Sequence, residues 1–355
     1  MDKASFFILN IILNSFLAFF TVALIIESVI FLFKIRQGRV AAVLRMVPLL
    51  KLPLDICLYD FSKWSYVHGI NPFYSEEGTR TLSAMIGLST RITDWLYLPV
   101  NTGIQLSLPG GLTFTIADLI GYLISPILLK TLAGLFIIIT LCIVARRLFL
   151  YYLSLATLRS LATSSQLSCK KVQNSALSSY IKKSEVKILT SPTLSGSPFV
   201  VGLISSAIYI STHLSNNLSE KEYEAILAHE MEHVRYRDGL VRLTLDIIKT
   251  VFWWIPTKWL RKRIEEGQEV GCDFKCYTYG IDATDLAAAV CKSAKYSANI
   301  PVPIFAHQLA KHTILKRINL LIQPPSMRFK KIRFALSCFA FGIAFLLFLG
   351  KFWIF

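Results

Sequence analysis

The chain has 355 residues, of which 54% are hydrophobic and 17% are charged, and its mean hydropathy is +0.53. This composition excludes an ordinary soluble enzyme, in which about 25% of residues are charged, and predicts an integral membrane protein in contact with a lipid bilayer. The net charge is +16, but no zinc-finger, RNP or basic-zipper pattern accompanies it, so direct binding of nucleic acid is not expected. The seven scattered cysteines show no CxxC spacing and do not predict a disulfide framework.

Four apolar stretches are candidates for membrane-spanning helices. The stretches at about 4–33, at about 117–146 and within 328–355 are each long enough to supply the roughly 20 residues that a bilayer requires. The stretch at 40–61 is the weakest candidate, because charged residues and a proline interrupt it. The interrupting residues are Arg45, Lys51, Pro53 and Asp55.

Basic clusters at the ends of these stretches predict their orientation. The clusters follow the first and third stretches and precede the last, and the positive-inside rule places all of them in the cytoplasm. We therefore expect residues 1–147 to form an N-terminal membrane region with an extracytoplasmic loop at about 62–112, and residues 328–355 to form a C-terminal transmembrane helix. Residues 148–327 would be one large cytoplasmic segment. The clusters are Lys34, Arg36 and Arg39; Arg146 and Arg147; and Arg328, Lys330, Lys331 and Arg333.

The cytoplasmic segment is expected to begin with a polar helical connector at about 148–185, followed by three short strands. Residues 186–189, 199–202 and 207–210 are rich in aliphatic and aromatic side chains and are bounded by turn residues. A small sheet at this point could bind an extended peptide along an exposed edge strand, or it could serve only core packing. Both interpretations stay open.

The clearest catalytic signal is the pentapeptide His-Glu-Met-Glu-His, which runs from His229 to His233. On a helix this spacing places two imidazoles one turn apart on one face, with the Glu230 carboxylate beside them, as a catalytic zinc site requires. Ser219 and Glu222 form a capping box, which predicts that the helix begins shortly before the motif. The alternative is an exposed helix on which the two histidines are incidental.

A catalytic zinc ion needs a third protein ligand, which leaves the fourth position for water. A second helix, expected from Pro256 to about Tyr279, offers Glu265, Glu266 and Glu269. We favour Glu269, because Asp273 follows one turn later on the same face and could accept a hydrogen bond from a ligand imidazole. The alternative is a solvated acidic face. Asp238 is a candidate either to orient a ligand histidine or to cap the next helix.

These residues resemble the Bla/Mec regulator family of membrane metallopeptidases. The resemblance rests on the pentapeptide and its flanks, on Trp254-Ile255-Pro256 and on Glu269-Val270-Gly271-Cys272-Asp273, and it covers about residues 186–325. It implies that His229, His233 and Glu269 bind one zinc ion, that Glu230 is the catalytic base, and that Asp273 supports the site. It also implies a cytoplasmic α+β zincin-like domain, between the third and fourth spans of a polytopic helical protein, in the bacterial inner membrane.

The chain departs from the family pattern in three respects. Ile255 stands where the family usually has asparagine, and Gly271 stands where it usually has alanine. The best-known relatives also carry a C-terminal penicillin-binding sensor domain after the last span, whereas this chain ends at Phe355. We therefore expect the protease core of the family, without the sensing of antibiotics.

The expected function is that of a membrane-embedded zinc endopeptidase that cleaves a protein or peptide substrate in regulated proteolysis or signalling. Glu230 would take the proton from zinc-bound water as that water attacks the scissile carbonyl. His307, His312 and Arg317 are candidates, by chemistry alone, to stabilise the oxyanion. Two alternatives remain: a signal transducer whose zinc domain binds a partner without proteolysis, and a prenyl-protein or quality-control type of membrane metalloprotease. The sequence does not indicate the substrate, the activating signal or the oligomeric state.

Overall fold

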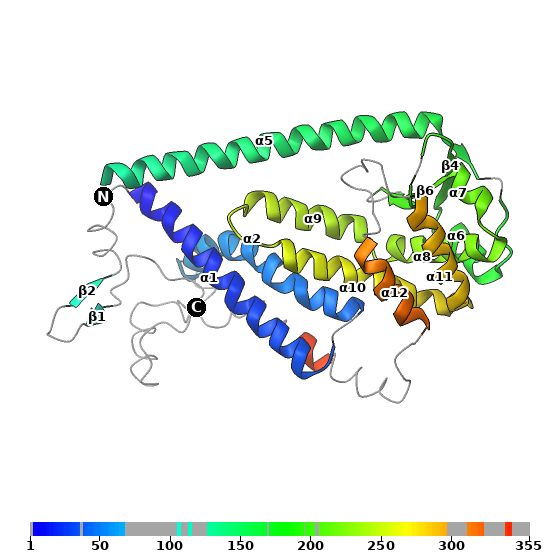
Figure 1. Cartoon of the computed structure of the whole chain (residues 1–355). Helices are drawn as coiled ribbons and strands as arrows, with labels where there is room; N and C mark the ends of the chain where they lie inside the picture. The colour runs from blue at the N-terminus through cyan, green and yellow to red at the C-terminus, as the bar shows by residue number, and fades with distance from the viewer. Residues whose placement is uncertain are drawn as a thin grey trace.

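The computed structural model describes residues 3–35, 38–67, 105–107, 113–115, 126–168, 170–194, 196–202, 206–296, 311–322 and 338–342. Within these ranges the chain is mostly helical, with a four-stranded sheet at one end and the two-stranded pair of β1 and β2 at the other (Figure 1). The helices are α1 (Lys3–Leu32), α2 (Arg39–Val67), α5 (Pro126–Ser164), α6 (Ser175–Lys183), α7 (Thr212–Asn217), α8 (Glu220–Arg235), α9 (Asp238–Val251), α10 (Lys258–Cys276), α11 (Ala283–Tyr296) and α12 (Lys311–Ile322). The strands are β1 (Gln105–Ser107), β2 (Thr113–Thr115), β3 (Gln166–Leu167), β4 (Lys187–Ser191), β5 (Phe199–Val201) and β6 (Ala207–Ser211).

The first two apolar stretches of the sequence are helical, as α1 and α2, and these helices pack against each other. The chain turns between them through Lys34 and Gly38, whose φ angles of 56° and 91° lie in the left-handed region. Arg45 of α2 binds Glu27 of α1 through hydrogen bonds of 2.7 and 3.2 Å, and only 8% of the arginine side chain is exposed. This ion pair ties the two helices together. That they cross a membrane stays a prediction.

The long helix α5 is the one described helix that is long and apolar enough to span a membrane, over Lys130–Ser164. It overlaps the span predicted at about 117–146, of which residues 117–125 lie outside the described ranges. The connector predicted at about 148–185 is helical only in part, because α5 ends at Ser164 and β3 and α6 follow it. With 39 residues, α5 is about 58 Å long, and it runs along one side of the molecule toward the sheet (Figure 1).

The three predicted strands are confirmed as β4, β5 and β6, and a fourth, the short β3, was not predicted. The strand order is β3-β4-β6-β5; β4 and β6 are parallel, and the two outer pairs are antiparallel. Ile208 and Ile210 of β6 are fully buried in one core with Tyr223 and Leu227 of α8. The sheet therefore supports the helix that carries the pentapeptide.

The helices α9 and α10 form a hairpin that shares a second core with α1 and α2. Leu245, Phe252 and Ile264 of the hairpin segment are buried in this core together with Phe19 of α1 and Leu49 of α2. The turn of the hairpin also contacts the apolar helices through its two tryptophans, whose indole Nε1 atoms each donate a hydrogen bond of 3.0 Å, one to α5 and one to α1. The N-terminal helices and the segment with the site are thus joined by apolar packing.

The boundaries of α10 are close to those predicted, but the expectation that Pro256 lies in its first turn was wrong. The helix begins at Lys258, because the chain first closes a turn in which Ile255 N donates to Phe252 O at 3.0 Å. A short 3-10 turn after α10 ends at Tyr279, as the sequence predicted for the end of the helix.

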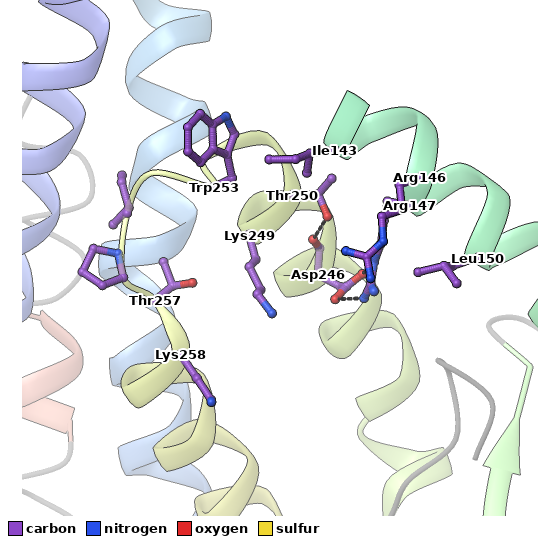
Figure 2. A pocket seen from close by; sticks show the side chains of 12 residues that line it. Ile143, Arg146, Arg147, Leu150, Asp246, Lys249, Thr250, Trp253, Thr257 and Lys258 are labelled. Carbon is purple, nitrogen blue, oxygen red and sulfur yellow. Dashed lines mark hydrogen bonds and ion pairs between the residues drawn. The ribbon is translucent and has the colours of Figure 1, made fainter. Parts of the chain in front are cut away.

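A buried carboxylate, Asp246 of α9, attaches α5 to the hairpin (Figure 2). Arg147 of α5 donates from Nε to Asp246 Oδ2 at 2.6 Å, and the hydroxyl of Tyr151 donates to the same oxygen. Arg261 of α10 donates to Asp246 Oδ1 at 2.9 Å. We call these four residues the Asp246 junction. The junction borders a cavity of about 360 Å³ between α5 and the hairpin.

The predicted extracytoplasmic loop at about 62–112 and the predicted C-terminal helix at 328–355 lie largely outside the described residues. Near the loop, the structure describes the end of α2 and the antiparallel pair of β1 and β2. Within the C-terminal stretch, residues 338–342 are helical. The loop, the last span and the four-span topology therefore stay predictions.

Candidate metal centre

The helix that carries the pentapeptide is α8, and it begins where the sequence predicts. Ser219 Oγ accepts a hydrogen bond from Glu222 N at 3.2 Å, and Glu222 Oε2 accepts one from Ser219 N at 2.8 Å, so the capping box is confirmed. Tyr223 is fully buried in the core beside the sheet, together with Leu218. This packing directs the helix inward, and both histidines of the pentapeptide are buried.

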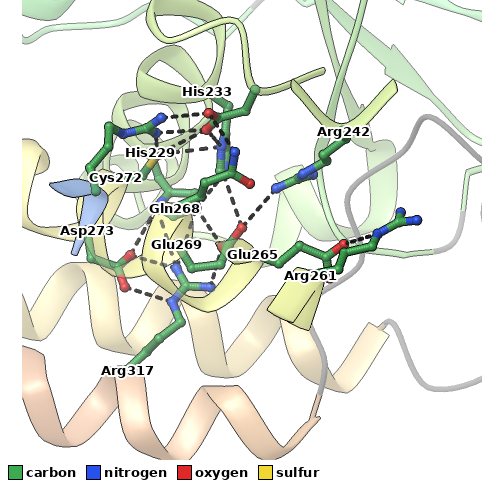
Figure 3. A network of polar contacts seen from close by, with 12 residues as sticks. His229, His233, Arg242, Arg261, Glu265, Gln268, Glu269, Cys272, Asp273 and Arg317 are labelled. Atoms are coloured by element: carbon green, nitrogen blue, oxygen red, sulfur yellow. Dashed lines mark hydrogen bonds and ion pairs between the residues drawn. The ribbon is translucent and has the colours of Figure 1, made fainter. Parts of the chain in front are cut away.

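The helices α8 and α10 bring together the three residues that were predicted to bind the metal. The Nε2 atoms of His229 and His233 are 3.2 Å apart, and they lie 3.3 and 3.4 Å from the Oε2 and Oε1 atoms of Glu269, respectively (Figure 3). Ligand atoms held about 2.0–2.1 Å from one tetrahedral metal ion are themselves roughly 3.3 Å apart. The three side chains therefore lie close enough together to share a single metal ion.

Each histidine of the site points its other ring nitrogen at a buried carboxylate. His233 Nδ1 donates to Asp238 Oδ2 at 2.6 Å, and His229 Nδ1 lies 3.0 Å from Asp273 Oδ1. Such contacts set the tautomer of a metal-binding imidazole and leave its Nε2 lone pair available for the metal. The structure therefore places Asp238 and Asp273 beside the proposed ligands. Of the two roles considered for Asp238, its contact with His233 supports the orienting role.

The surroundings of the imidazoles favour positive charge. Burial lowers the pKa of His233, but charge interactions with Cys272 and Glu269 and the hydrogen bond to Asp238 outweigh this effect and raise the pKa to about 10. Burial raises the pKa of Asp238, whereas hydrogen bonds from Arg39 and His233 bring it well below its ordinary value. The electrostatic potential at the imidazoles is therefore negative, as it must be at a site for a metal cation.

Two arginines hold the carboxylates that surround the imidazoles. Arg317 is fully buried and donates from Nε and Nη2 to Asp273 at 2.7 and 2.6 Å, and from Nη1 to Glu269 Oε2 at 3.0 Å (Figure 3). Arg242 donates to Glu269 Oε1 at 3.2 Å. Both oxygens of Glu269 are therefore oriented by charge-assisted hydrogen bonds from α12 and α9.

Three polar residues of the site were not predicted: Arg39, Arg242 and Gln268. Arg39 of α2 donates to both oxygens of Asp238, at 2.6 and 2.8 Å, and Gln268 donates to one of them at 3.2 Å. The sequence gives no sign of the Arg39 contact, because its two residues are 199 positions apart. A weak indication of Arg242 was present in the sequence, because this residue follows Asp238 by four positions on an amphipathic helix and so lies on the same face.

Glu230, the predicted catalytic base, is buried on α8 next to the first of the two histidines. Its side chain is almost completely covered, and its Oε2 atom has no hydrogen-bond partner among the described residues. A buried polar atom without a partner costs about 1–3 kcal/mol or more, so it calls for a functional explanation. One such explanation is that this carboxylate accepts a proton or binds a ligand during the reaction.

The site has two buried imidazoles and one carboxylate that can share a metal ion, and a second carboxylate, Glu230, lies beside the imidazoles on α8. Metallopeptidases have centres of this kind. Comparison with known families agrees, since residues 124–321 match the family described as BlaR1 peptidase M56. The match covers more than half of the chain, and the chain belongs to this metallopeptidase family. The resemblance to Bla/Mec regulators is thereby confirmed.

Individual relatives match over a shorter stretch. The chain is 33% identical to the regulatory protein BlaR1 of Bacillus licheniformis over 88 residues, which are 24% of this chain and 14% of that protein. It is 31% identical to the methicillin resistance mecR1 protein of Staphylococcus aureus (strain Mu50 / ATCC 700699) over 77 residues, which are 21% of this chain and 13% of that protein. The matches thus span about one seventh of the length of these relatives.

Proposed function

We propose that the chain is a zinc-dependent endopeptidase of the bacterial inner membrane, which cleaves a protein or peptide substrate in regulated proteolysis or signalling. The observation that carries this proposal is the convergence of His229, His233 and Glu269 on one position. Beside the two histidines on α8 lies Glu230, whose Oε2 atom has no hydrogen-bond partner among the described residues. Membership in the BlaR1 peptidase M56 family supports the same class of reaction. The basic clusters that flank the apolar stretches support a cytoplasmic position for the site.

His229, His233 and Glu269 would hold the zinc ion. When bound, zinc polarises the scissile carbonyl and lowers the pKa of a coordinated water molecule to about 7. Glu230 accepts the proton of the attacking water and delivers it to the leaving amine, a role that a carboxylate free of other partners can fill. Asp238 and Asp273 keep the two imidazoles in the tautomer and orientation that present Nε2.

Arg317, one of the three candidates for stabilising the oxyanion, has a different role in this proposal. Its Nε and both terminal nitrogens already donate to Asp273 and Glu269, so it orients these carboxylates instead of facing a substrate. His307 and the side chain of His312 lie outside the described residues. The identity of the oxyanion donor is therefore left open.

The decisive experiment compares full-length wild-type protein with Glu230→Gln in lipid nanodiscs, measuring zinc content and cleavage of a peptide library by mass spectrometry. We expect wild type to contain about one zinc ion per chain and to cleave. Glu230→Gln should keep its zinc and lose cleavage by about 10²–10⁴-fold, because a general base contributes that much to the rate. Glu232→Gln is the matched control, since Glu232 is buried on the same helix but its Oε1 atom accepts hydrogen bonds from Tyr279 and Arg235.

The outcomes separate this proposal from its alternatives. Wild type without bound metal, or Glu230→Gln with the cleavage rate of wild type, would overturn the proposal. A transducer that only binds a partner would retain its signalling phenotype in Glu230→Gln cells. A prenyl-protein or quality-control protease would instead trap membrane proteins, rather than a soluble regulator, on the inactive variant.

A further inference from the structure

The first residue of α2, Arg39, reaches from the N-terminal helices into the metal centre. Its two terminal nitrogens donate to the two oxygens of Asp238, at 2.6 and 2.8 Å. Asp238 is 1% exposed, and its Oδ2 also accepts the hydrogen bond from His233 Nδ1. One buried carboxylate is therefore shared between a guanidinium of α2 and an imidazole proposed to bind the metal. Bidentate pairs of this kind fix both distance and orientation.

The guanidinium of Arg39 is held from two further sides. Its Cζ atom lies 3.7 Å from the centroid of the Tyr236 ring, at the end of α8, so the planar group stacks on an aromatic face. Its Nη2 atom is 3.1 Å from Cys272 Sγ of α10. Arg39 consequently contacts the end of α8, the start of α9 and the C-terminal half of α10, which are the elements that carry the site.

Two glycines of α10 allow α2 to come this close. A Cβ atom at Gly267 would lie 2.9 Å from both Ala42 Cβ and Gly38 O, and a Cβ atom at Gly271 would lie 3.0 Å from Arg39 Cβ. The two glycines are one turn apart on the helix that supplies Glu269. The absence of a side chain at Gly271 makes room for the arginine.

We propose that Arg39 is a positioning residue through which the α1–α2 pair controls the metal centre. With α2 seated on α10, Arg39 holds Asp238, and Asp238 holds His233 with its Nε2 atom toward the metal. When α2 moves away from α10, Asp238 loses its bidentate partner and His233 is held less firmly, so the metal is bound more weakly and cleavage slows. This regulation rests on the proposed function of the site.

The geometry of α2 suits such a role. The helix has 29 residues and is roughly 43 Å long, so a tilt at its far end displaces its first residue. The chain enters α2 through the left-handed conformations of Lys34 and Gly38, where the direction of the backbone changes. Val22 and Ile26 of α1 share a buried apolar core with Leu44 of α2, so the two helices would move as one unit.

The test uses Co²⁺ as the probe, because its visible spectrum reports the ligand geometry and its titration gives the metal affinity of the full-length protein in nanodiscs. Arg39→Gln should bind Co²⁺ about 10-fold more weakly with a changed spectrum, since loss of a group that supports a metal ligand costs about 10–100-fold in affinity. Arg39→Lys should recover part of this loss. Arg45→Gln is the matched control: it removes another buried ion pair of α2 that makes no contact with the site, and it should stay within about 2-fold of wild type.

Two double variants test whether Arg39 acts through Asp238 and whether the position of α2 on α10 acts through Arg39. Asp238→Asn and Arg39→Gln/Asp238→Asn should bind Co²⁺ equally weakly, because Arg39 acts through Asp238. Gly267→Ala should push α2 away from α10 and weaken Co²⁺ binding, but it should have no further effect in the Arg39→Gln background. Thermal unfolding of each variant shows whether the protein is folded at the temperature of the titration.

The proposal is overturned if Arg39→Gln binds Co²⁺ with the affinity and spectrum of wild type. It is also overturned if Arg45→Gln loses as much affinity, or if the losses in the double variants simply add. Failure of the proposed function gives a different result. Wild type would bind Co²⁺, and Arg39→Gln would bind it more weakly, yet Glu230→Gln would cleave as well as wild type. Absence of Co²⁺ binding by wild type would overturn both.

Discussion

The metal centre and the Asp246 junction are both built around buried carboxylates held by arginines, but they differ in what else these carboxylates touch. Asp238 and Asp273 each contact an imidazole that faces the proposed metal position. Asp246 contacts two arginines and a tyrosine, and none of the histidines in the described ranges. The same ion-pair chemistry therefore serves to orient metal ligands in one region and to attach helices in the other.

The difference shows that burial and charge alone do not identify a functional carboxylate. Asp246 is as buried as the carboxylates of the metal centre, with 3% exposure against 2% for Asp273. What separates the two regions is an unpartnered polar atom, Glu230 Oε2, and the convergence of Nε2 atoms on one position. Variants in the two regions should accordingly affect different measurements.

The largest expected effect is the loss of the metal on His233→Ala. This variant removes one of three ligands and should reduce the zinc content from about one ion per chain to near zero, with loss of all cleavage. Elemental analysis of the protein in nanodiscs measures the metal. Asp246→Asn is the comparison and should retain its zinc. A His233→Ala protein that still holds stoichiometric zinc would show that the metal lies elsewhere.

Arg317→Met should produce the largest loss of stability in the metal-free protein, about 3–5 kcal/mol, because it leaves Asp273 as a buried charge without an arginine and leaves Glu269 with Arg242 alone. Zinc should restore part of this stability, since the added cation interacts with Glu269. Unfolding by denaturant, with and without zinc, measures the loss of stability and the part that zinc restores. If Arg317→Met lost the same free energy of unfolding with and without zinc, Arg317 would not act on the metal centre.

The pH dependence of the metal-free protein should distinguish the two regions. The pKa of His233 is raised from 6.5 to about 10, so the stability that its protonated form contributes is fully present below pH 6.5 and is lost as the pH rises toward about 10. The Asp246 junction has no such group. We therefore expect the Tm of wild type to fall over this alkaline range and that of His233→Gln to fall less. Parallel curves for the two proteins would contradict this assignment.

The smallest expected effect is that of Asp246→Asn, a loss of about 2 kcal/mol. One amide oxygen still accepts a hydrogen bond, but Arg147 loses its charge partner and Arg261 keeps only Glu265. The attachment of α5 to the hairpin should loosen, which protease accessibility between these elements can measure. Glu265→Gln is the control, since Glu265 pairs with Arg261 alone and near the surface. A change in Co²⁺ affinity in Asp246→Asn would show that the junction is coupled to the metal centre.

Local sequence determined the parts of the site that depend on helix geometry. The capping box at Ser219 and the spacing of His229, Glu230 and His233 predicted α8 and its buried face, because residues three or four apart on a helix must be neighbours. The same periodicity paired Glu269 with Asp273 on α10. The three strands before α8 were likewise predicted from short runs of aliphatic and aromatic residues.

Only the tertiary structure decided which distant groups complete the site. Arg317 was one of three cationic candidates by chemistry, and its contacts with Asp273 and Glu269 depend on how α12 packs on α10. Arg39 looked like a charge at the end of an apolar stretch, and Gly271 like an unexplained replacement of alanine. Their contact exists because α2 lies directly on α10.

The division has a physical reason. Helix periodicity and capping act within a few residues, so the sequence by itself determined the pentapeptide helix and the spacing of the metal ligands proposed on it. A salt bridge between Arg39 and Asp238 depends instead on the closeness of two helices, which the whole apolar core sets through many small contacts. The sequence thus determined which side chains of α8 and α10 are candidates for the metal site, and the tertiary structure decided which distant parts of the chain hold them in place.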